Sequence, residues 1–479
     1  MTRAALFSLR RFGRRAVLAL LAFLVLAGAL ASRPARSLMD FDQPFYITIA
    51  YDLDRHGVFS NGIFSGVDSA QDTPPAGMFF GPVYPLLVLA AMRIDPRFAA
   101  AVRCNVEADR NHDDTARCEP YATPMRIIHA LLLGLGVLAI AAAGEQMYRS
   151  KAVFWLAGGL ATIGLVAEAD IFSFVMTESI AFALYSAFAL TIVLAWTTPR
   201  LRYFILAGGL LGILCLTRPS FLVLFPVVAA LSLLHGYRLA VPRRPRTAAR
   251  VLALTLAFVA VVGAWSARNA VAVGKFGLTE EYGSAALIER FAYDDMTARE
   301  FFQAFAYCVP GIGDLGFDLV YGTDSMHRFV FHTPGSFFHA GRDRRDALAA
   351  EHGRLDPLIG GIIREEMRAN WWRYLLVSIP LAWCGMWAGW LASLVLIPLF
   401  ACACVRAVRA SQPLLLLYAA PALVMLALHA AVANQTTRYN LILIGPFAVG
   451  AAWIVSAWRS DVSGSRTTAR GPVPEPSKS

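Results

Sequence analysis

The sequence predicts an all-α membrane protein with about ten transmembrane helices, and three observations support that fold class. First, 57% of the 479 residues are hydrophobic and only 16% are charged, whereas soluble domains carry about 25% charged residues. Second, the apolar residues form runs close to the roughly 20 residues that a helix needs to cross a bilayer. Third, the net charge of +10 comes from short basic clusters between these runs. Such clusters orient membrane helices, and they are not the continuous patch of a nucleic-acid-binding protein.

The expected elements follow in chain order. Residues 1–15 form a basic N-terminus, and the apolar run 16–31 follows it. This run could be a cleaved signal peptide, but we interpret it as an uncleaved anchor because the later topology requires it. Nine further runs are expected to span the membrane: 124–147, 152–169, 171–196, 202–217, 219–235, 250–268, 385–406, 412–432 and 440–458. A break is expected at Arg218-Pro219, because proline lacks an N–H and disfavours a helical residue before it.

The basic residues test this topology. If the N-terminus is cytoplasmic, every loop that falls inside is basic with almost no acid, as the positive-inside rule requires. The residues concerned are Arg149, Lys151, Arg200, Arg202, Arg238, Arg243, Arg244, Arg246, Arg250, Arg406 and Arg409. The shorter run 82–92 is interpreted as a helix at the membrane surface, because counting it as a span would reverse every later loop. We therefore expect a multi-pass membrane protein with both termini cytoplasmic.

The chain divides into a transmembrane module, an exterior domain and a second group of spans. The module covers 16–269 and includes the long exterior loop 32–123, in which Cys104 and Cys118 either form a disulfide or remain two thiols. Residues 270–384 are expected to form a small helical exterior domain that ends in an amphipathic, tryptophan-containing surface helix. The spans of 385–458 follow, and the cytoplasmic tail 459–479 is rich in serine, proline and arginine and is expected to be disordered.

Two carboxylates, Asp40 and Asp42, follow the first span. Asp42 and Tyr46 are four residues apart, so they share one face of a helix. Asp42 is equally well placed to cap the start of that helix, because a proline lies in its first turn. Tyr84 lies between two prolines, where it either belongs to a site or only marks the start of the surface helix. Both interpretations remain open for each residue.

Four more ionisable residues lie at the exterior ends of expected spans: Glu178, Arg218, Arg268 and Arg438. Charges in membrane spans are costly and usually functional, although an arginine can also extend its side chain to lipid headgroups. Arginines and acids that lie together at the exterior ends of the spans could bind and use a lipid-linked sugar. Guanidinium groups can neutralise a departing phosphate, and a carboxylate can accept the proton of the incoming hydroxyl. Direct displacement with one base would invert the anomeric centre.

These motifs, in their order along residues 16–458, resemble those of the GT-C glycosyltransferases. The nearest subgroup is the bacterial relatives of dolichyl-phosphate-mannose protein mannosyltransferases. The motifs concerned are Asp42-x-x-x-Tyr46, Gly81-Pro82-Val83-Tyr84-Pro85, Thr177-Glu178, Leu216-Thr217-Arg218-Pro219, Trp265-x-x-Arg268-Asn269 and Arg438-Tyr439. The resemblance implies a location in the cytoplasmic membrane of a bacterium and a polyprenyl-phosphate-linked sugar as donor, used on the exterior face. It also implies that Asp42 is the catalytic carboxylate.

The predicted function is therefore an inverting glycosyltransferase of the cell envelope. It would move a hexosyl or related group from a polyprenyl-phosphate-linked donor to a hydroxyl of a glycan, lipid or protein. Asp42 would be the base, with Asp40 or Glu178 in support or as a ligand of a divalent metal ion. The predicted donor-binding residues are Arg218, Arg268, Arg438, Tyr46, Tyr84 and Glu178. Two alternatives are a transporter or flippase of a lipid-linked saccharide, and a ligase that moves a whole glycan.

Overall fold

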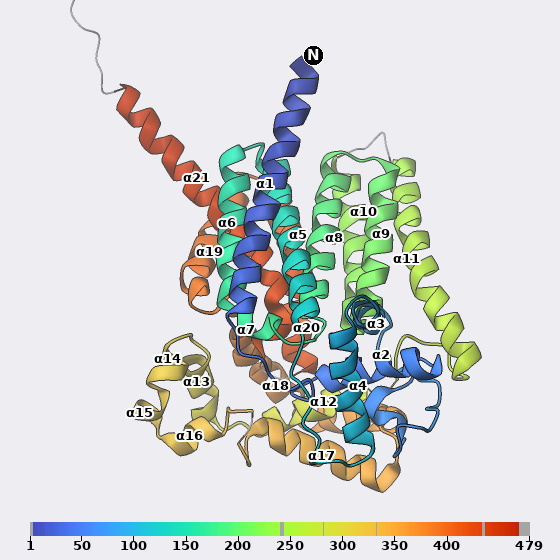
Figure 1. Ribbon diagram of the computed structural model, residues 1–479. Helices are drawn as coiled ribbons and strands as arrows, with labels where there is room; N and C mark the ends of the chain where they lie inside the picture. Colours follow the sequence, from blue (N-terminus) through green and yellow to red (C-terminus); the bar gives the residue numbers. More distant parts are fainter. Residues whose placement is uncertain (1–2, 240–243, 281, 332, 434–435, 469–479) are drawn as a thin grey trace, which may run out of the picture.

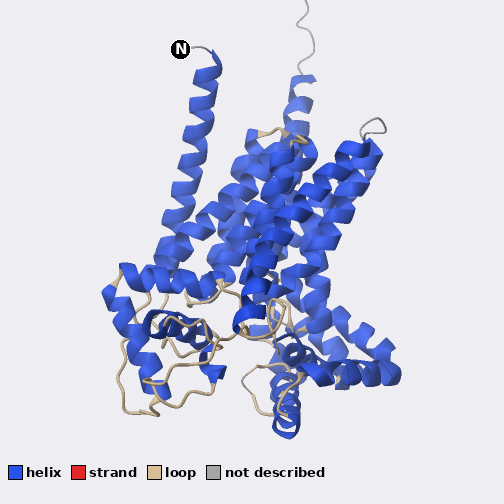
Figure 2. Ribbon diagram, turned by 90° about the vertical axis from the view of Figure 1, so that its right-hand side faces the viewer, coloured by secondary structure: helices blue, strands red, loops and turns tan. Residues whose placement is uncertain are grey.

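The computed structural model describes residues 3–239, 244–280, 282–331, 333–433 and 436–468. This part of the chain contains helices and loops but no strands, and its long helices form an upright bundle (Figures 1 and 2). The bundle helices are α1 (Arg3–Ala31), α5 (Thr123–Tyr148), α6 (Lys151–Ala167), α8 (Glu178–Thr197), α9 (Leu201–Thr217), α10 (Leu224–Leu239), α11 (Arg244–Ala272), α19 (Ser393–Arg409), α20 (Leu414–Val432) and α21 (Ile444–Thr468). The all-α, polytopic fold class predicted from the sequence is confirmed.

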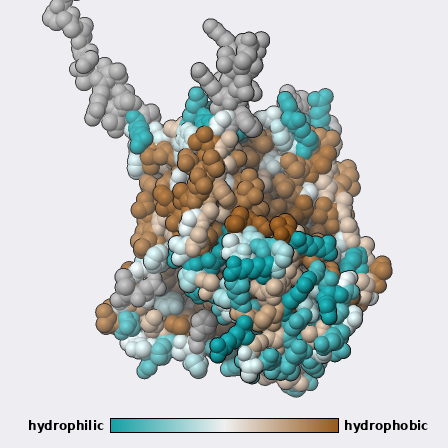
Figure 3. Space-filling model, in the orientation of Figure 1, coloured by the Kyte–Doolittle hydropathy of each residue, from teal (hydrophilic) through white to brown (hydrophobic). Residues whose placement is uncertain are grey.

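The face of the bundle drawn in Figure 3 carries a broad apolar belt, as expected for a protein that crosses a bilayer. Eight segments of the described chain are long and apolar enough to span a membrane, while α6 and α9 are shorter apolar helices of 17 residues. Small residues let neighbouring helices approach closely. At Gly208 in α9, for example, a Cβ atom would lie only 2.1 Å from the carbonyl oxygen of Leu254 in α11.

Both described chain ends lie at one end of the bundle, here called the termini end, and the opposite end is called the distal end (Figure 1). The termini end carries the basic connections around Arg149 and Arg200 and the basic end of α19. Residues 240–243, including Arg243, lie outside the described residues. Arg14 of α1 pairs there with Glu145 of α5 at 2.6 Å. The predicted arrangement of basic loops on one side therefore holds for the described loops.

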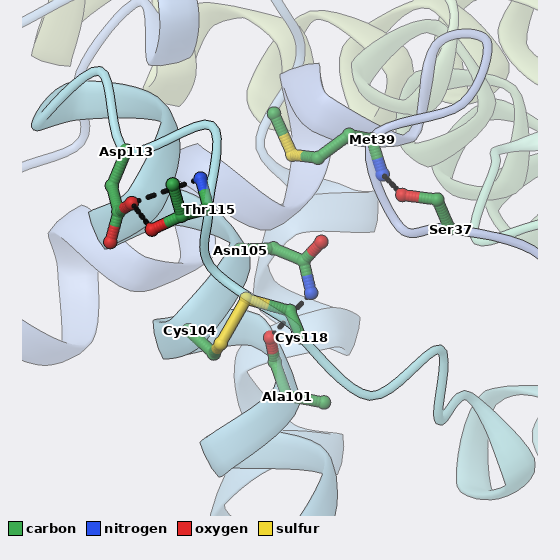
Figure 4. Close-up of a disulfide and its surroundings, with 8 residues drawn as sticks. All are labelled: Ser37, Met39, Ala101, Cys104, Asn105, Asp113, Thr115 and Cys118. Atoms are coloured by element: carbon green, nitrogen blue, oxygen red, sulfur yellow. Dashed lines mark hydrogen bonds between the residues drawn. A yellow bond between two sulfur atoms is a disulfide. The ribbon is translucent and has the colours of Figure 1, made fainter.

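The first distal loop, residues 32–122, carries α2 (Gln43–His56), η1 (Gly62–Ser65), α3 (Val83–Ile94) and α4 (Pro96–Arg110). Figure 1 looks along the axis of α3, which runs across the direction of the bundle helices. Cys104 and Cys118 form a disulfide that closes the end of this loop (Figure 4). Deeper in the loop, Arg110 of α4 pairs with the fully buried Asp52 of α2 at 2.8 Å. The ion pair holds α2 against α4, and the disulfide ties α4 to the segment that leads into α5.

The distal domain contains α12 (Tyr282–Phe291), η4 (Ala292–Asp295), α13 (Ala298–Tyr307), α14 (Ile312–Leu315), α15 (Phe317–Tyr321), α16 (Thr323–His327), α17 (Phe337–His352) and the first part of α18 (Asp356–Met386). Its small core includes Tyr293, Phe317, Phe329 and Phe337. α18 bends at Asn370, whose backbone is not helical (φ −144°, ψ 30°). Trp371 and Trp372 follow this bend and are exposed, as suits residues at a membrane surface.

The structure differs from the sequence-based prediction at three places. α21 continues to Thr468, so 459–468 are helical where a disordered tail was expected. No proline interrupts this stretch, because the first proline of the tail is Pro472. Residues 469–479 lie outside the described part. The span expected from 171 begins only at Glu178, after the short helix α7 (Ala169–Phe172). A second disulfide, Cys308–Cys384, joins α18 to the end of α13 and was not anticipated.

Candidate active site

Asp42 occupies the N-cap position of α2, but its carboxylate makes no capping hydrogen bond. Its backbone carbonyl accepts a bond from the Phe45 N–H at 3.3 Å, which is enough to start the helix. The carboxylate is directed instead to Arg438, whose Nη2 donates to Asp42 Oδ2. Because the Asp42 side chain remains 33% exposed, its carboxylate is both paired and open to solvent. The helix-cap interpretation is therefore right about the position and wrong about the carboxylate.

Gln43 fixes the turn that presents Asp42. Its amide donates to the carbonyl oxygens of Ser37 at 2.9 Å and Asp40 at 3.1 Å. Its side-chain oxygen accepts from the Val175 N–H at 2.8 Å, which joins the turn to the segment before α8. Phe41 adopts a left-handed backbone (φ +54°) within the turn. Such a conformation is costly for a bulky residue and occurs where surrounding contacts impose it.

Glu178 is the first residue of α8 and its side chain is only 2% exposed. Arg218 Nη2 donates to its Oε1 at 2.5 Å, and Arg438 Nε lies 3.7 Å from the same oxygen. The other oxygen, Oε2, is buried without a hydrogen-bond partner. A buried carboxylate is unfavourable unless cations compensate it. Glu178 therefore depends on both arginines and links them.

Arg218 lies in the break between α9 and the short helix η2 (Pro219–Val223), where the sequence predicted an interruption. Its extended backbone (φ −142°, ψ 111°) is the conformation that a following proline favours. Besides Glu178, its guanidinium donates from Nε to the Thr177 hydroxyl at 2.7 Å. The Tyr439 ring lies 5.5 Å from the Cζ of Arg218 and 5.0 Å from that of Arg438. The two guanidinium groups thus lie near the same aromatic ring.

Arg438 belongs to η6 (Thr437–Leu443), just before α21. Its Nη1 is directed at the sulfur of Met176 at 3.7 Å, and a thioether is only a weak acceptor. Together with Asp42, Glu178 and Arg218 it forms a cluster, here called the acid–arginine cluster. Two carboxylates and two guanidinium groups give the cluster a formal charge of zero. Its members come from four chain segments that meet at the distal end of the bundle.

Two predicted tyrosines line the cluster at different depths. Tyr46 is mostly buried, and its burial together with the charge of Asp42 raises the pKa of its phenol above the usual range. Its hydroxyl therefore stays protonated and can donate. Tyr84 packs edge-to-face on Tyr46 with ring centroids 5.0 Å apart, but its hydroxyl is engaged by His129 Nε2 at 3.0 Å. His129 donates from Nδ1 to the Phe172 carbonyl at 2.9 Å, which leaves Nε2 as the acceptor.

Arg268 does not join the acid–arginine cluster. It donates from Nη1 to the Gly77 carbonyl at 2.7 Å and from Nη2 to the Phe59 carbonyl at 3.2 Å. It also lies over the Trp265 ring, with Cζ 4.9 Å from the centroid. Those carbonyls belong to an irregular part of the first distal loop, where backbone acceptors need donors. The expected gathering of three arginines is thus seen for two of them, and Arg268 fastens the loop.

Asp40 is exposed, and its side chain makes no hydrogen bond or ion pair within the described residues. In the described part of the chain, no group of three or more histidine, cysteine, aspartate or glutamate side chains comes together. A divalent metal ion at the site stays a prediction. Sequence reasoning missed Gln43 and Met176. Neither carries a motif, and only their tertiary contacts with Val175 and Arg438 reveal their place in the site.

The fold and the cluster define a polytopic membrane protein with an acid–arginine site at one end of its spans. No protein-family profile and no curated protein matches the chain. Among solved structures, it is similar to ArnT from Cupriavidus metallidurans in the apo state, with a TM-score of 0.46 and 12% identity over 95% of this chain and 63% of that one. It is also similar to ArnT of that organism bound to undecaprenyl phosphate, with a TM-score of 0.37 and 13% identity over 97% and 81%. The chain therefore spans less than two thirds of the first of these structures, and likeness at this level identifies no site residue.

Proposed function

We propose that this protein is an inverting glycosyltransferase that takes a sugar from a polyprenyl-phosphate-linked donor and transfers it to an acceptor hydroxyl. The acid–arginine cluster is the observation that carries the proposal. It combines a partly exposed carboxylate, Asp42, with two guanidinium groups at the membrane boundary. A lipid phosphate held at that boundary would bring its sugar to the carboxylate. A donor that is anchored in the bilayer needs a site at this level.

The reaction follows from the charges of the cluster. Asp42 accepts the proton of the acceptor hydroxyl as the acceptor oxygen bonds to the anomeric carbon. The bond between that carbon and the phosphate oxygen breaks, and its electron pair stays on the phosphate. Arg218 and Arg438 neutralise the phosphate as its charge grows. Because a single carboxylate acts in one displacement, the anomeric configuration is inverted. Glu178 keeps the two guanidinium groups in place.

The formal charge of the site does not change during this reaction. Before transfer, the neutral cluster and a phosphodiester donor together carry −1. After transfer, Asp42 is protonated and the cluster carries +1, while the polyprenyl phosphate monoester carries about −2. The sum is again −1. The proton that Asp42 removes is thus matched by the charge that the leaving phosphate gains, so a site of low dielectric does not have to accommodate additional net charge.

Two independent features support our proposal that the distal end of the bundle lies on the exterior face. Both disulfides lie at the distal end, and disulfides persist in oxidising compartments. The described basic connections lie at the termini end, which the positive-inside rule places in the cytoplasm. The proposed transfer therefore takes place outside the cytoplasmic membrane. Undecaprenyl phosphate, the lipid bound in one of the ArnT structures, is a suitable carrier with which to begin testing.

The test uses membrane vesicles that contain the full-length protein and a radiolabelled undecaprenyl-phosphate-linked sugar mixture, with extracted envelope glycans as acceptors. Asp42→Asn is expected to lower the transfer rate by about 10²- to 10⁴-fold, the usual contribution of a general base. Asp114→Asn makes the same charge change at an exposed loop residue and is expected to leave the rate unchanged. An Asp42→Asn protein that inserts normally and transfers sugar at the wild-type rate contradicts the assignment. Movement of intact lipid-linked sugar without a new glycosidic bond supports the transporter alternative.

A further inference from the structure

The partners of Arg438 are unequal in strength. Nη2 donates to the Asp42 carboxylate and lies 3.3 Å from the Tyr439 hydroxyl. Nε is 3.7 Å from Glu178, which is longer than a good hydrogen bond. Among the described residues, the partner of Nη1 is the Met176 sulfur, at 3.7 Å. One strong contact therefore holds this guanidinium, and its Nη1 faces a weak acceptor that a phosphate oxygen would replace with advantage.

Arg218 is held much more firmly. It is fixed by the Thr177 hydroxyl at 2.7 Å and by the buried Glu178 at 2.5 Å. Glu178 could not lose that pairing without leaving a buried charge uncompensated. Asp42 is different because its side chain is 33% exposed. If Arg438 leaves Asp42, solvent or an acceptor hydroxyl can hydrogen-bond to the freed carboxylate.

We propose that Arg438 is a shared counter-ion for which Asp42 and the lipid phosphate compete. Without phosphate, Arg438 pairs with Asp42 and keeps the carboxylate directed toward the site. When a lipid phosphate binds, Arg438 turns to it and Asp42 becomes available to the acceptor hydroxyl. Arg438 is therefore a positioning residue for Asp42 as well as a phosphate ligand. This proposal rests on the proposed function, because it assumes that a lipid phosphate binds at the cluster.

Competition for the Arg438 guanidinium predicts that loss of the Asp42 charge strengthens phosphate binding. Ionised Asp42 weakens phosphate binding, since it occupies Arg438 and adds negative charge beside the phosphate. Removing that charge is expected to tighten the binding of the lipid phosphate even though it removes the catalytic base. Damage to the fold or to the site would weaken binding instead. The direction of the change therefore separates competition from a structural role of Asp42.

The experiment measures binding of undecaprenyl phosphate to the purified full-length protein in detergent by titration calorimetry. Asp42→Asn is expected to bind about five- to tenfold more tightly than wild type, the effect of a partly exposed charge pair. Arg438→Gln is expected to bind more weakly. In the double variant, the gain from Asp42→Asn is expected to disappear, because the competed group is absent. Asp40→Asn makes the same charge change two residues away, at a side chain without an ion partner, and its affinity should change by less than about twofold.

Each other outcome has a definite meaning. The competition is refuted if folded Asp42→Asn binds the lipid phosphate no more tightly than wild type, or if the gain persists in the Arg438→Gln background. Folding is checked by the Cys104–Cys118 and Cys308–Cys384 disulfides, which are resolved on non-reducing gels. If neither wild type nor any variant binds undecaprenyl phosphate, both the competition and the proposed donor are refuted. If binding follows the predicted pattern while Asp42→Asn still transfers sugar, the competition stands and the base assignment fails.

Discussion

Arg290 anchors the distal domain to the bundle, and replacing it is expected to separate the two. Its side chain is completely buried. Nη1 pairs with Asp294 at 2.8 Å, Nε donates to the Ala430 carbonyl of α20 at 2.9 Å, and Nη2 lies 3.0 Å from the Ser378 hydroxyl of α18. Arg290→Met keeps much of the volume but removes every one of these contacts. The substitution also leaves Asp294, a buried carboxylate, without its cation.

The magnitude follows from that unpaired carboxylate. Breaking a buried ion pair by removing one partner costs about 3–5 kcal/mol. The hydrogen bonds that the guanidinium donates to the neutral carbonyl and hydroxyl oxygens add about 1 kcal/mol each, partly offset by methionine packing. A loss of about 4 kcal/mol is expected to lower the apparent melting temperature in detergent by roughly 4–8 °C. Adding Asp294→Asn removes the buried charge and should recover about half of the loss.

The assay follows thermal unfolding of the purified protein by tryptophan fluorescence. Arg97→Met is the matched control, because Arg97 forms an exposed ion pair with Glu119, and such pairs contribute about 1 kcal/mol or less. Its melting temperature should therefore stay within about 3 °C of wild type. The reasoning is wrong if Arg290→Met melts like Arg97→Met. It is also wrong if the double variant is less stable than the single one.

Two further predictions concern the first distal loop. Arg268→Gln should speed hydrogen exchange in 57–80, because the Gly77 and Phe59 carbonyls lose their donor. The affinity for undecaprenyl phosphate should stay within about threefold of wild type, and a much larger loss would mean that Arg268 binds the donor after all. Cys104→Ser removes the disulfide that closes this loop and should lower the free energy of unfolding by about 3 kcal/mol. The protein should then melt at a lower temperature than wild type, and an unchanged melting temperature contradicts a stabilising role of the disulfide.

The spans were predictable because they depend on local composition. A run of about 20 apolar residues must be helical in lipid, where no water can satisfy the backbone. The break at Arg218-Pro219 was predictable for the same reason, since proline acts on its immediate neighbours. The helical stretch 459–468 was missed because its composition is polar, yet it contains no proline to stop the preceding helix.

The sequence alone did not predict which partners the charged residues contact. Arg268 and Arg438 both lie at a distal helix end beside an aromatic residue, and nothing local distinguishes them. Arg268 is drawn to carbonyl oxygens of a loop about 190 residues earlier, whereas Arg438 meets a carboxylate 396 residues earlier. Arg290 carried no motif at all, although it is the most deeply buried arginine of the distal domain. Such pairings are set by packing between segments that are remote in sequence.

The structure does distinguish the three acids that the sequence left as candidates. Asp40 is exposed and pairs with no cation among the described residues, so no such contact directs it toward a phosphate-bound sugar. Glu178 faces both arginines, but it is 2% exposed and an acceptor hydroxyl could not reach it without displacing Arg218. Asp42 combines a directing contact with an open side, because Arg438 takes one oxygen while the side chain stays partly exposed. A general base needs both orientation and access to the proton. Asp42 is the one of the three acids that has both.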